Sequence, residues 1–219
     1  MIWFPLGVFA LLIILGMTFI PAPKRSPGFI FSCVMALLIS FLVSFLYSFI
    51  KNTFPLTDDT TRIMYHYMVH DHLFFYYPGA VAVLLSLVCI RKDFTRPAAQ
   101  AAALVLFCFY MFLAMLATFF YSQHGNWADP YFLFYLTGSR TLQCLVFASL
   151  VHFIIIKPKL FFVLPALCII LAIPFATAFV SYFYYTSHPC KALLLLGILY
   201  GVALVSYLTG ALIAWRRKA

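Results

Sequence analysis

Arg140 is the residue whose type and position in this sequence most directly suggest chemistry. It follows Thr137-Gly138-Ser139 inside a long apolar stretch, nine residues past Tyr131, which is roughly 13 Å along a helix. An arginine near the centre of a membrane-spanning helix costs about 2.5 to 3.5 kcal/mol to insert, so it should face a polar cavity or an anionic group. Because a guanidinium binds phosphate and carboxylate through paired hydrogen bonds, we predict that Arg140 and Ser139 bind a ligand. The alternative is a structural arginine that snorkels or is satisfied by carbonyl groups.

A second group of polar residues recurs with helical spacing between positions 59 and 70. Asp59, Arg62, His66 and His70 are three, four and four residues apart, which places them on one stripe of a helix over about 60 to 70. We therefore predict that Asp59 and Arg62 also contribute to ligand binding. The alternative is that the stripe is the wet face of an amphipathic helix lying on the outer membrane surface.

Histidines are the candidate catalytic and metal-binding groups. At i and i+4, His66 and His70 can approach one metal ion or act as acid and base. The catalytic candidates are His66, His70, His124 and His188, and the candidate metal ligands are His66, His70, His72 and Asp71. Their convergence with Arg140 on one outward-facing cavity would make a site, whereas histidines scattered in solvent would carry no function.

The number and positions of the acidic residues exclude some classes of membrane protein. The sequence contains no glutamate, and its aspartates all lie between the apolar stretches. This excludes intramembrane proteolysis by a carboxylate pair and argues against proton coupling through buried acids. The sequence also lacks the HExxH zinc-protease motif, and it identifies no cofactor.

Composition predicts the membrane-spanning helices that must position these residues. Of 219 residues, 66% are hydrophobic and 9% are charged, against about 25% charged in soluble domains. Crossing a bilayer takes about 20 apolar residues in a helix. Seven apolar stretches fit, at about 2–20, 29–50, 72–90, 98–121, 131–156, 161–184 and 192–215. We therefore predict an all-α fold, a single transmembrane domain over 1–219 built as a bundle of seven helices, with an outer interfacial helix over about 60–70.

Small residues suggest how the last predicted helix packs. Gly197 and Gly201 are four residues apart, a spacing that permits close contact between helices. We predict packing within the bundle here, with a conduction path or a homodimer seam as alternatives.

Basic residues predict the orientation, because lysine and arginine are retained on the cytoplasmic side. Ten of the fourteen basic residues fall in alternate connectors and the tail, where with Asp93 they give +9. The other side has three basic residues and four aspartates, giving −1. This predicts an outer N-terminus and a cytoplasmic C-terminus. An interfacial belt of tyrosines is predicted at the outer ends, at Tyr47, Tyr76, Tyr77, Tyr121, Tyr131, Tyr182, Tyr184 and Tyr185.

These observations favour a multi-pass protein of the plasma membrane that binds or transports a small anionic molecule or lipid headgroup through an outward-facing cavity. One alternative is an outer-leaflet enzyme, a lipid or phosphate transferase or hydrolase, that uses the outer histidines and Arg140. Another is a non-catalytic subunit that packs against partner membrane proteins. The lipid bilayer is the expected surrounding, and the net charge of +9 needs no nucleic-acid partner because it follows from orientation.

Overall fold

The computed structural model describes residues 3–18, 75–90, 95–121, 130–156, 159–185 and 188–216, together with short runs between 27 and 46. Within these ranges every regular element is helical. The continuous α-helices are α1 (Trp3–Thr18), α4 (Tyr77–Ile90), α5 (Arg96–Tyr121), α6 (Pro130–Ile155), α7 (Leu160–Tyr185) and α8 (Pro189–Arg216). The prediction of an all-α protein is confirmed.

Four of these helices are long and apolar enough to cross a membrane. The qualifying segments are Pro97–Leu116 of α5, Leu133–Ile155 of α6, Leu160–Tyr184 of α7 and Pro189–Thr209 of α8. Helices α1 and α4 also contain apolar segments, but these are shorter. The chain therefore has the helices of a multi-pass membrane protein, while the count of seven spans stays a prediction. The predicted interfacial helix over 60–70 lies outside the described residues.

Prolines mark where three of the long helices begin. Pro97, Pro130 and Pro189 lie in the first turn of α5, α6 and α8. At that position a missing N–H removes no intrahelical hydrogen bond, and the fixed φ of proline suits the helix. In α5 the Ala99 amide donates to the Thr95 carbonyl at 2.9 Å, which is a hydrogen bond of the first turn that Pro97 helps to start.

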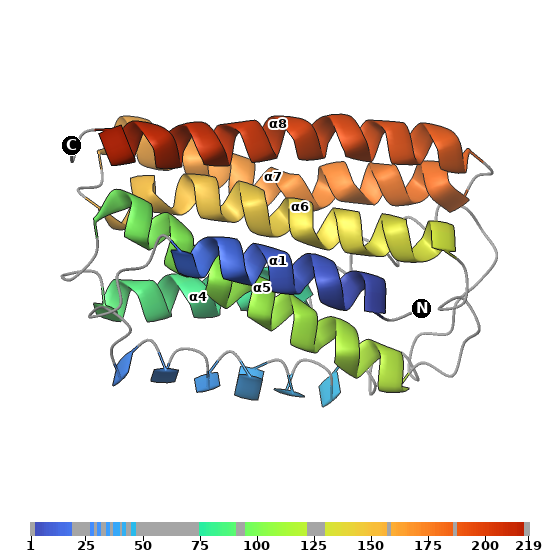
Figure 1. Cartoon of the computed structure of the whole chain (residues 1–219), viewed down its shortest axis with the longest axis horizontal. Coiled ribbons are helices and arrows are strands. Elements are labelled where there is room, and N and C mark those ends of the chain that lie inside the picture. The colour runs from blue at the N-terminus through green and yellow to red at the C-terminus, as the bar shows by residue number, and fades with distance from the viewer. Residues whose placement is uncertain are drawn as a thin grey trace.

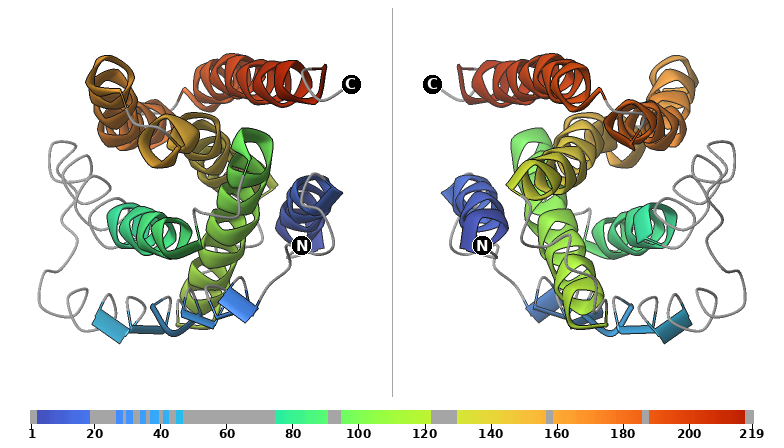
Figure 2. Two further views of the ribbon diagram at one scale, coloured as in Figure 1. Left: turned by 90° about the vertical axis from the view of Figure 1, so that its left-hand side faces the viewer. Right: turned by 90° about the vertical axis from the view of Figure 1, so that its right-hand side faces the viewer.

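Helices α5 and α6 form the centre of the bundle. Helices α1 and α4 pack against α5, whereas α7 and α8 pack against α6. Viewed from the end, α1 and α8 lie on one side of this central pair and α4 lies on the other (Figure 2). Helices α1, α6 and α8 all begin at the same end of the molecule, so they run in the same direction (Figure 1).

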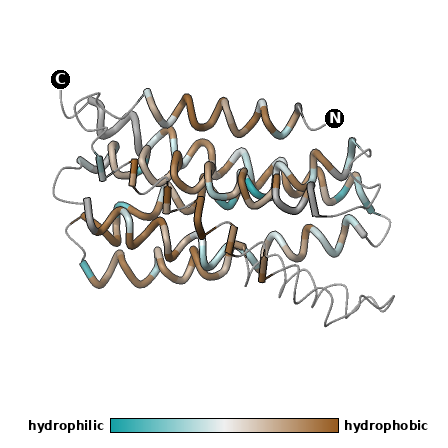
Figure 3. Tube along the Cα trace, turned by 90° about the horizontal axis from the view of Figure 1, so that it is seen from below, coloured by the Kyte–Doolittle hydropathy of each residue, from teal (hydrophilic) through white to brown (hydrophobic). Residues whose placement is uncertain are grey.

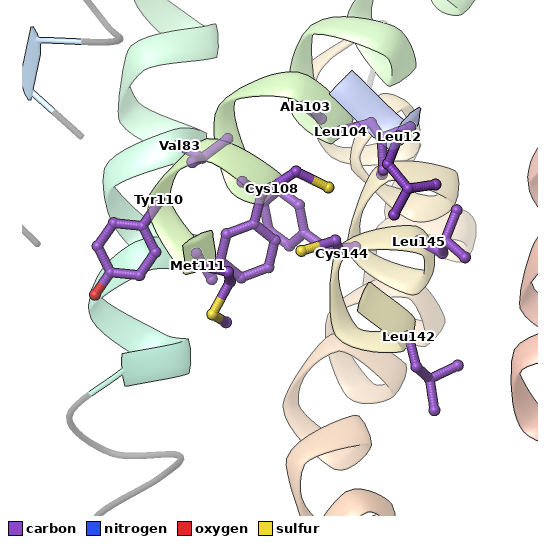
Figure 4. Close-up of a cluster of buried hydrophobic side chains, with 14 of the residues drawn as sticks. Leu12, Val83, Ala103, Leu104, Cys108, Tyr110, Met111, Leu142, Cys144 and Leu145 are labelled. Atoms are coloured by element: carbon purple, nitrogen blue, oxygen red, sulfur yellow. The ribbon is translucent and has the colours of Figure 1, made fainter. Parts of the chain in front are cut away.

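Aromatic, sulfur-containing and small side chains fill the contact between α5 and α6. The ring centroids of Phe107 and Phe147 are 4.6 Å apart, and Cys108 and Cys144 are buried at the same contact (Figure 4). Five alanines over residues 98–103 of α5 are also buried. Their small side chains let neighbouring helices approach closely.

Buried hydrogen bonds add to this packing on both sides of α6. Gln100 of α5 donates to the Ser149 carbonyl at 3.2 Å and bonds the His152 Nδ1 atom at 3.0 Å. On the other side, Gln143 donates to the Thr177 hydroxyl of α7 at 2.9 Å. In hydrocarbon a buried polar group needs a protein partner, so these bonds fix which faces of α5, α6 and α7 meet.

Helices α7 and α8 turn apolar surface outward. In an 18-residue apolar stretch of each helix only 22% of the residues are buried, and Leu194 is 67% exposed. Apolar residues run along most of the helical trace (Figure 3). Such continuous apolar surface is rare on soluble monomers, whereas lipid hydrocarbon solvates it. The outside of the bundle therefore matches a membrane environment.

Candidate functional site

The N-terminal half of α6 presents two different surfaces. Thr137, Gly138 and Thr141 line a groove shared with α1 and α8, whereas Arg140 lines a small cavity shared with α5 and Phe75. Because successive helical residues point about 100° apart, Arg140 points about 100° away from Thr141 and about 160° away from Gly138, which separates the two surfaces. Each surface is a candidate site and is described in turn.

Arg140 is buried within the bundle, with 8% of its surface exposed. The Cζ atom of its guanidinium lies 5.6 Å from the centroid of the Phe75 ring, a distance at which a cation is attracted to an aromatic face. The cavity beside it has a volume of about 20 Å³ and is otherwise lined by Met111, Ala114, Met115 and Leu136 together with Phe75. That volume holds about one water molecule.

Ser139 is the predicted ligand-binding neighbour of Arg140. Its side chain is buried, and its hydroxyl donates to the Leu136 carbonyl of the same helix at 3.2 Å. Ser139 is therefore satisfied within α6, and it does not line the cavity beside Arg140.

The α1/α6/α8 groove is a much larger feature, with a volume of about 450 Å³. It is partly open to the surface of the bundle. Ten residues line it: Phe4 and Val8 of α1, Phe134, Thr137, Gly138 and Thr141 of α6, and Leu193, Leu196, Gly197 and Tyr200 of α8. Ligand sites in proteins are typically about 300 to 1,000 Å³ and mostly apolar, with a few polar groups. The groove has this size and composition.

Two glycines shape the groove in different ways. A Cβ added at Gly138 would lie 2.7 Å from the Leu196 Cδ2 atom, so the absence of a side chain there lets α8 approach α6. A Cβ added at Gly197 would meet nothing within 4 Å, and the same holds for Gly201. The prediction that Gly197 and Gly201 serve packing within the bundle is therefore wrong in this structure, because Gly197 faces the groove and both glycines are exposed.

The groove occupies one level of the bundle. Its α6 wall runs from the fourth to the eleventh residue after Pro130, and its α8 wall runs over the same interval after Pro189. At 1.5 Å per residue, these walls lie roughly 6 to 16 Å from the helix starts. Since α1, α6 and α8 start at one end, the groove lies wholly in that half of the bundle (Figure 1).

Three hydroxyls interrupt the apolar lining. The Thr137 Oγ1 atom is buried and has no hydrogen-bond partner. The Thr141 hydroxyl donates to the Thr137 carbonyl at 2.8 Å, and the Tyr200 hydroxyl lies within hydrogen-bonding reach of Thr141. Thr137 and Thr141 are one helical turn apart, so the polar groups cluster within the groove.

The histidine candidates are only partly placed. His188 is exposed at the turn between α7 and α8, where its amide donates to the Phe183 carbonyl at 3.2 Å and its carbonyl accepts the Ala192 amide at 3.1 Å. Its backbone thus shapes this turn. The remaining predicted site residues, which lie outside the described ranges, are Asp59, Arg62, His66, His70, Asp71, His72 and His124. In the part of the chain that the structure describes, no cluster of three or more potential metal-ligating residues occurs.

Most groove residues were not singled out by the sequence analysis. Thr137 and Gly138 were noted as neighbours of Arg140, and Gly197 for its spacing, but nothing linked them to Phe4 or Tyr200. The available signal was the coincidence of small and hydroxyl residues at matching distances from Pro130 and Pro189. That signal becomes meaningful only once α6 and α8 are known to be neighbours.

No protein-family model matches the chain, and no curated protein or solved structure is similar to it. The function is therefore argued from the site alone.

Proposed function

We propose that this chain is a seven-helix plasma-membrane protein that binds a lipid in the α1/α6/α8 groove. In the proposed orientation the N-terminus is outside and the C-terminus is cytoplasmic, so the groove opens into the outer half of the bilayer. The observation that carries the proposal is a ligand-sized, largely apolar groove whose α6 and α8 walls belong to candidate membrane spans. Lipid binding is compatible with a binding protein or with a transporter.

Lipid is the occupant favoured by the surroundings of the groove. Its walls at Phe4, Val8, Phe134 and Leu193 offer hydrocarbon and aromatic surface. Ordered water needs several polar partners, which such walls do not supply. A hydrocarbon chain entering from the bilayer loses no hydrogen bonds and fills the space with van der Waals contacts.

A photo-cross-linking experiment tests lipid binding. The purified full chain is reconstituted into phosphatidylcholine vesicles that contain phosphatidylcholine with a diazirine on one acyl chain, and the labelled peptides are identified by mass spectrometry. We expect labels to concentrate on groove residues. Gly197→Phe should reduce that labelling about tenfold, because the new ring enters space in which a Cβ meets nothing within 4 Å.

Val202→Phe is the matched control. Val202 is 63% exposed on the same helix but is not a groove residue, and it lies about 140° around α8 from Gly197. It adds a ring to the outer surface and should leave groove labelling unchanged. Labelling that is uniform over all exposed helix faces, or that persists undiminished in Gly197→Phe, would contradict the proposal.

Arg140 supports a second candidate function, the binding of an anionic group. Its buried guanidinium beside the Phe75 ring is the favouring observation. The adjoining cavity of about 20 Å³ holds about one water molecule, so the described residues support the lipid groove more strongly. If Arg140 binds an anion, inorganic phosphate should raise the melting temperature of the wild type but not of Arg140→Lys, since an ammonium lacks the planar paired donors. A wild type that phosphate does not stabilise would exclude this role for free phosphate.

A further inference from the structure

We propose that the ligand of the α1/α6/α8 groove is a neutral lipid alcohol whose hydroxyl bonds Thr137. This inference rests on the proposed function and names the chemistry of the ligand. It starts from Thr137, which is 2% exposed and lines the groove, yet has a hydroxyl with no partner.

The missing partner sets Thr137 apart from comparable residues in this chain. Serine and threonine in helices usually donate to a carbonyl three or four residues earlier. Thr141 does so at 2.8 Å, Ser181 at 3.0 Å and Thr209 at 2.7 Å. Thr137 does not, so one buried hydroxyl in the wall of the groove has no partner. A buried polar group without a partner is unfavourable unless something supplies one.

The neighbouring hydroxyls indicate which group fits. Thr141 donates to the Thr137 carbonyl at 2.8 Å, and the Tyr200 hydroxyl lies beside Thr141. The Tyr200 oxygen has a lone pair that can accept, while Thr137 can donate or accept. A ligand hydroxyl can both donate and accept, whereas an ester carbonyl or an ether can only accept.

Depth argues against a charged ligand group at this position. Thr137 is seven residues past Pro130, which is roughly 10 Å along the helix. Charge at such depth is expensive in a bilayer, and neither Thr137, Thr141 nor Tyr200 carries charge to compensate it. A neutral hydroxyl on a long hydrocarbon skeleton can bond Thr137 without placing a charge at this depth.

The test compares two probes that differ by one hydroxyl. Octadecanol and octadecane, each with a diazirine at the same carbon, are added to phosphatidylcholine vesicles containing the full chain. The readout is the ratio of alcohol to alkane labelling on groove peptides, compared between variants so that the different partitioning of the two probes cancels. Thr137→Val, which keeps the shape and removes the hydroxyl, should lower this ratio about fivefold. Thr137→Ser should retain it, and Thr209→Val, which removes an exposed hydroxyl on α8, should leave it unchanged.

The outcomes separate this inference from the proposed function. A ratio that is equal in wild type and Thr137→Val overturns the alcohol assignment while the groove still labels. A ratio that falls equally in Thr137→Ser also overturns it, since shape would then be the cause. Loss of groove labelling by both probes in the wild type instead counts against lipid binding itself.

Discussion

Pro174 removes a backbone donor from the middle of α7, and a tyrosine from another helix replaces it. A proline at this position cannot bond the carbonyl four residues earlier, which is that of Ile170. The Tyr76 hydroxyl donates to the Ile170 carbonyl at 3.0 Å, and the Tyr77 hydroxyl donates to the Leu171 carbonyl at 3.0 Å. Tyr76, just before α4, and Tyr77, its first residue, thus supply donors to two α7 carbonyls near Pro174.

This arrangement predicts a non-additive pair of mutations. Tyr76 is fully buried, so Tyr76→Phe leaves the Ile170 carbonyl without its donor and should cost about 1 to 3 kcal/mol of unfolding free energy. In a Pro174→Ala background the restored amide can bond Ile170, so the same change should cost less than about 0.5 kcal/mol. Reversible unfolding in mixed detergent micelles measures both. Equal costs in the two backgrounds would show that Tyr76 does not replace the missing amide.

The role of Tyr76 shows where sequence reasoning fails for individual residues. We predicted Tyr76 and Tyr131 as members of an interfacial belt. Tyr131 is 60% exposed, but Tyr76 is buried. The partner of Tyr76 is a carbonyl freed by a proline almost a hundred positions away, and no local pattern connects the two. Arg140, by contrast, is buried as its insertion cost requires.

Gly16 has no side chain, which lets helix α1 lie close to α5. A Cβ at Gly16 would lie 2.6 Å from the Val105 Cγ2 atom and 3.2 Å from the Ala101 carbonyl oxygen. The backbones of α1 and α5 therefore approach closely here, as small residues allow in membrane bundles. Helix α1 also contributes Phe4 and Val8 to the groove, two turns or more before this contact.

Gly16→Ala should consequently destabilise the protein by about 1 to 3 kcal/mol, because the added methyl group forces α1 and α5 apart. The control is Gly7→Ala in the same helix, where an added Cβ meets nothing within 4 Å and should be neutral or slightly stabilising. Thermal melts in one detergent compare the two variants. We expect Val105→Ala to recover part of the loss in Gly16→Ala, and its failure to do so would place the strain elsewhere.

The sequence was most informative about individual helices and least informative about their contacts. Apolar length predicts α5, α6 and α8 well, because this signal acts within a helix. The groove depends on α1, α6 and α8, which are distant in sequence and are brought together only by packing on α5 and α6. Helical periodicity cannot predict such neighbours when most faces of every helix are apolar.

The proposed orientation of the whole molecule can be tested with cysteine labelling. Cys190 is exposed at the start of α8, and Lys159 is exposed at the start of α7, which lies at the other end of the bundle (Figure 1). In intact cells a membrane-impermeant maleimide should label Cys190, whereas Lys159→Cys should add label only after permeabilisation. The reverse pattern would overturn the outer N-terminus.

The central claim is that the α1/α6/α8 groove holds a lipid, and a high-resolution density map of the protein in lipid nanodiscs tests it most directly. The account predicts elongated density of a hydrocarbon skeleton along α6 and α8, with its polar end within hydrogen-bonding distance of Thr137. A groove closed by contact between α1 and α8, or open and without ordered density at a resolution that shows side chains, would contradict it.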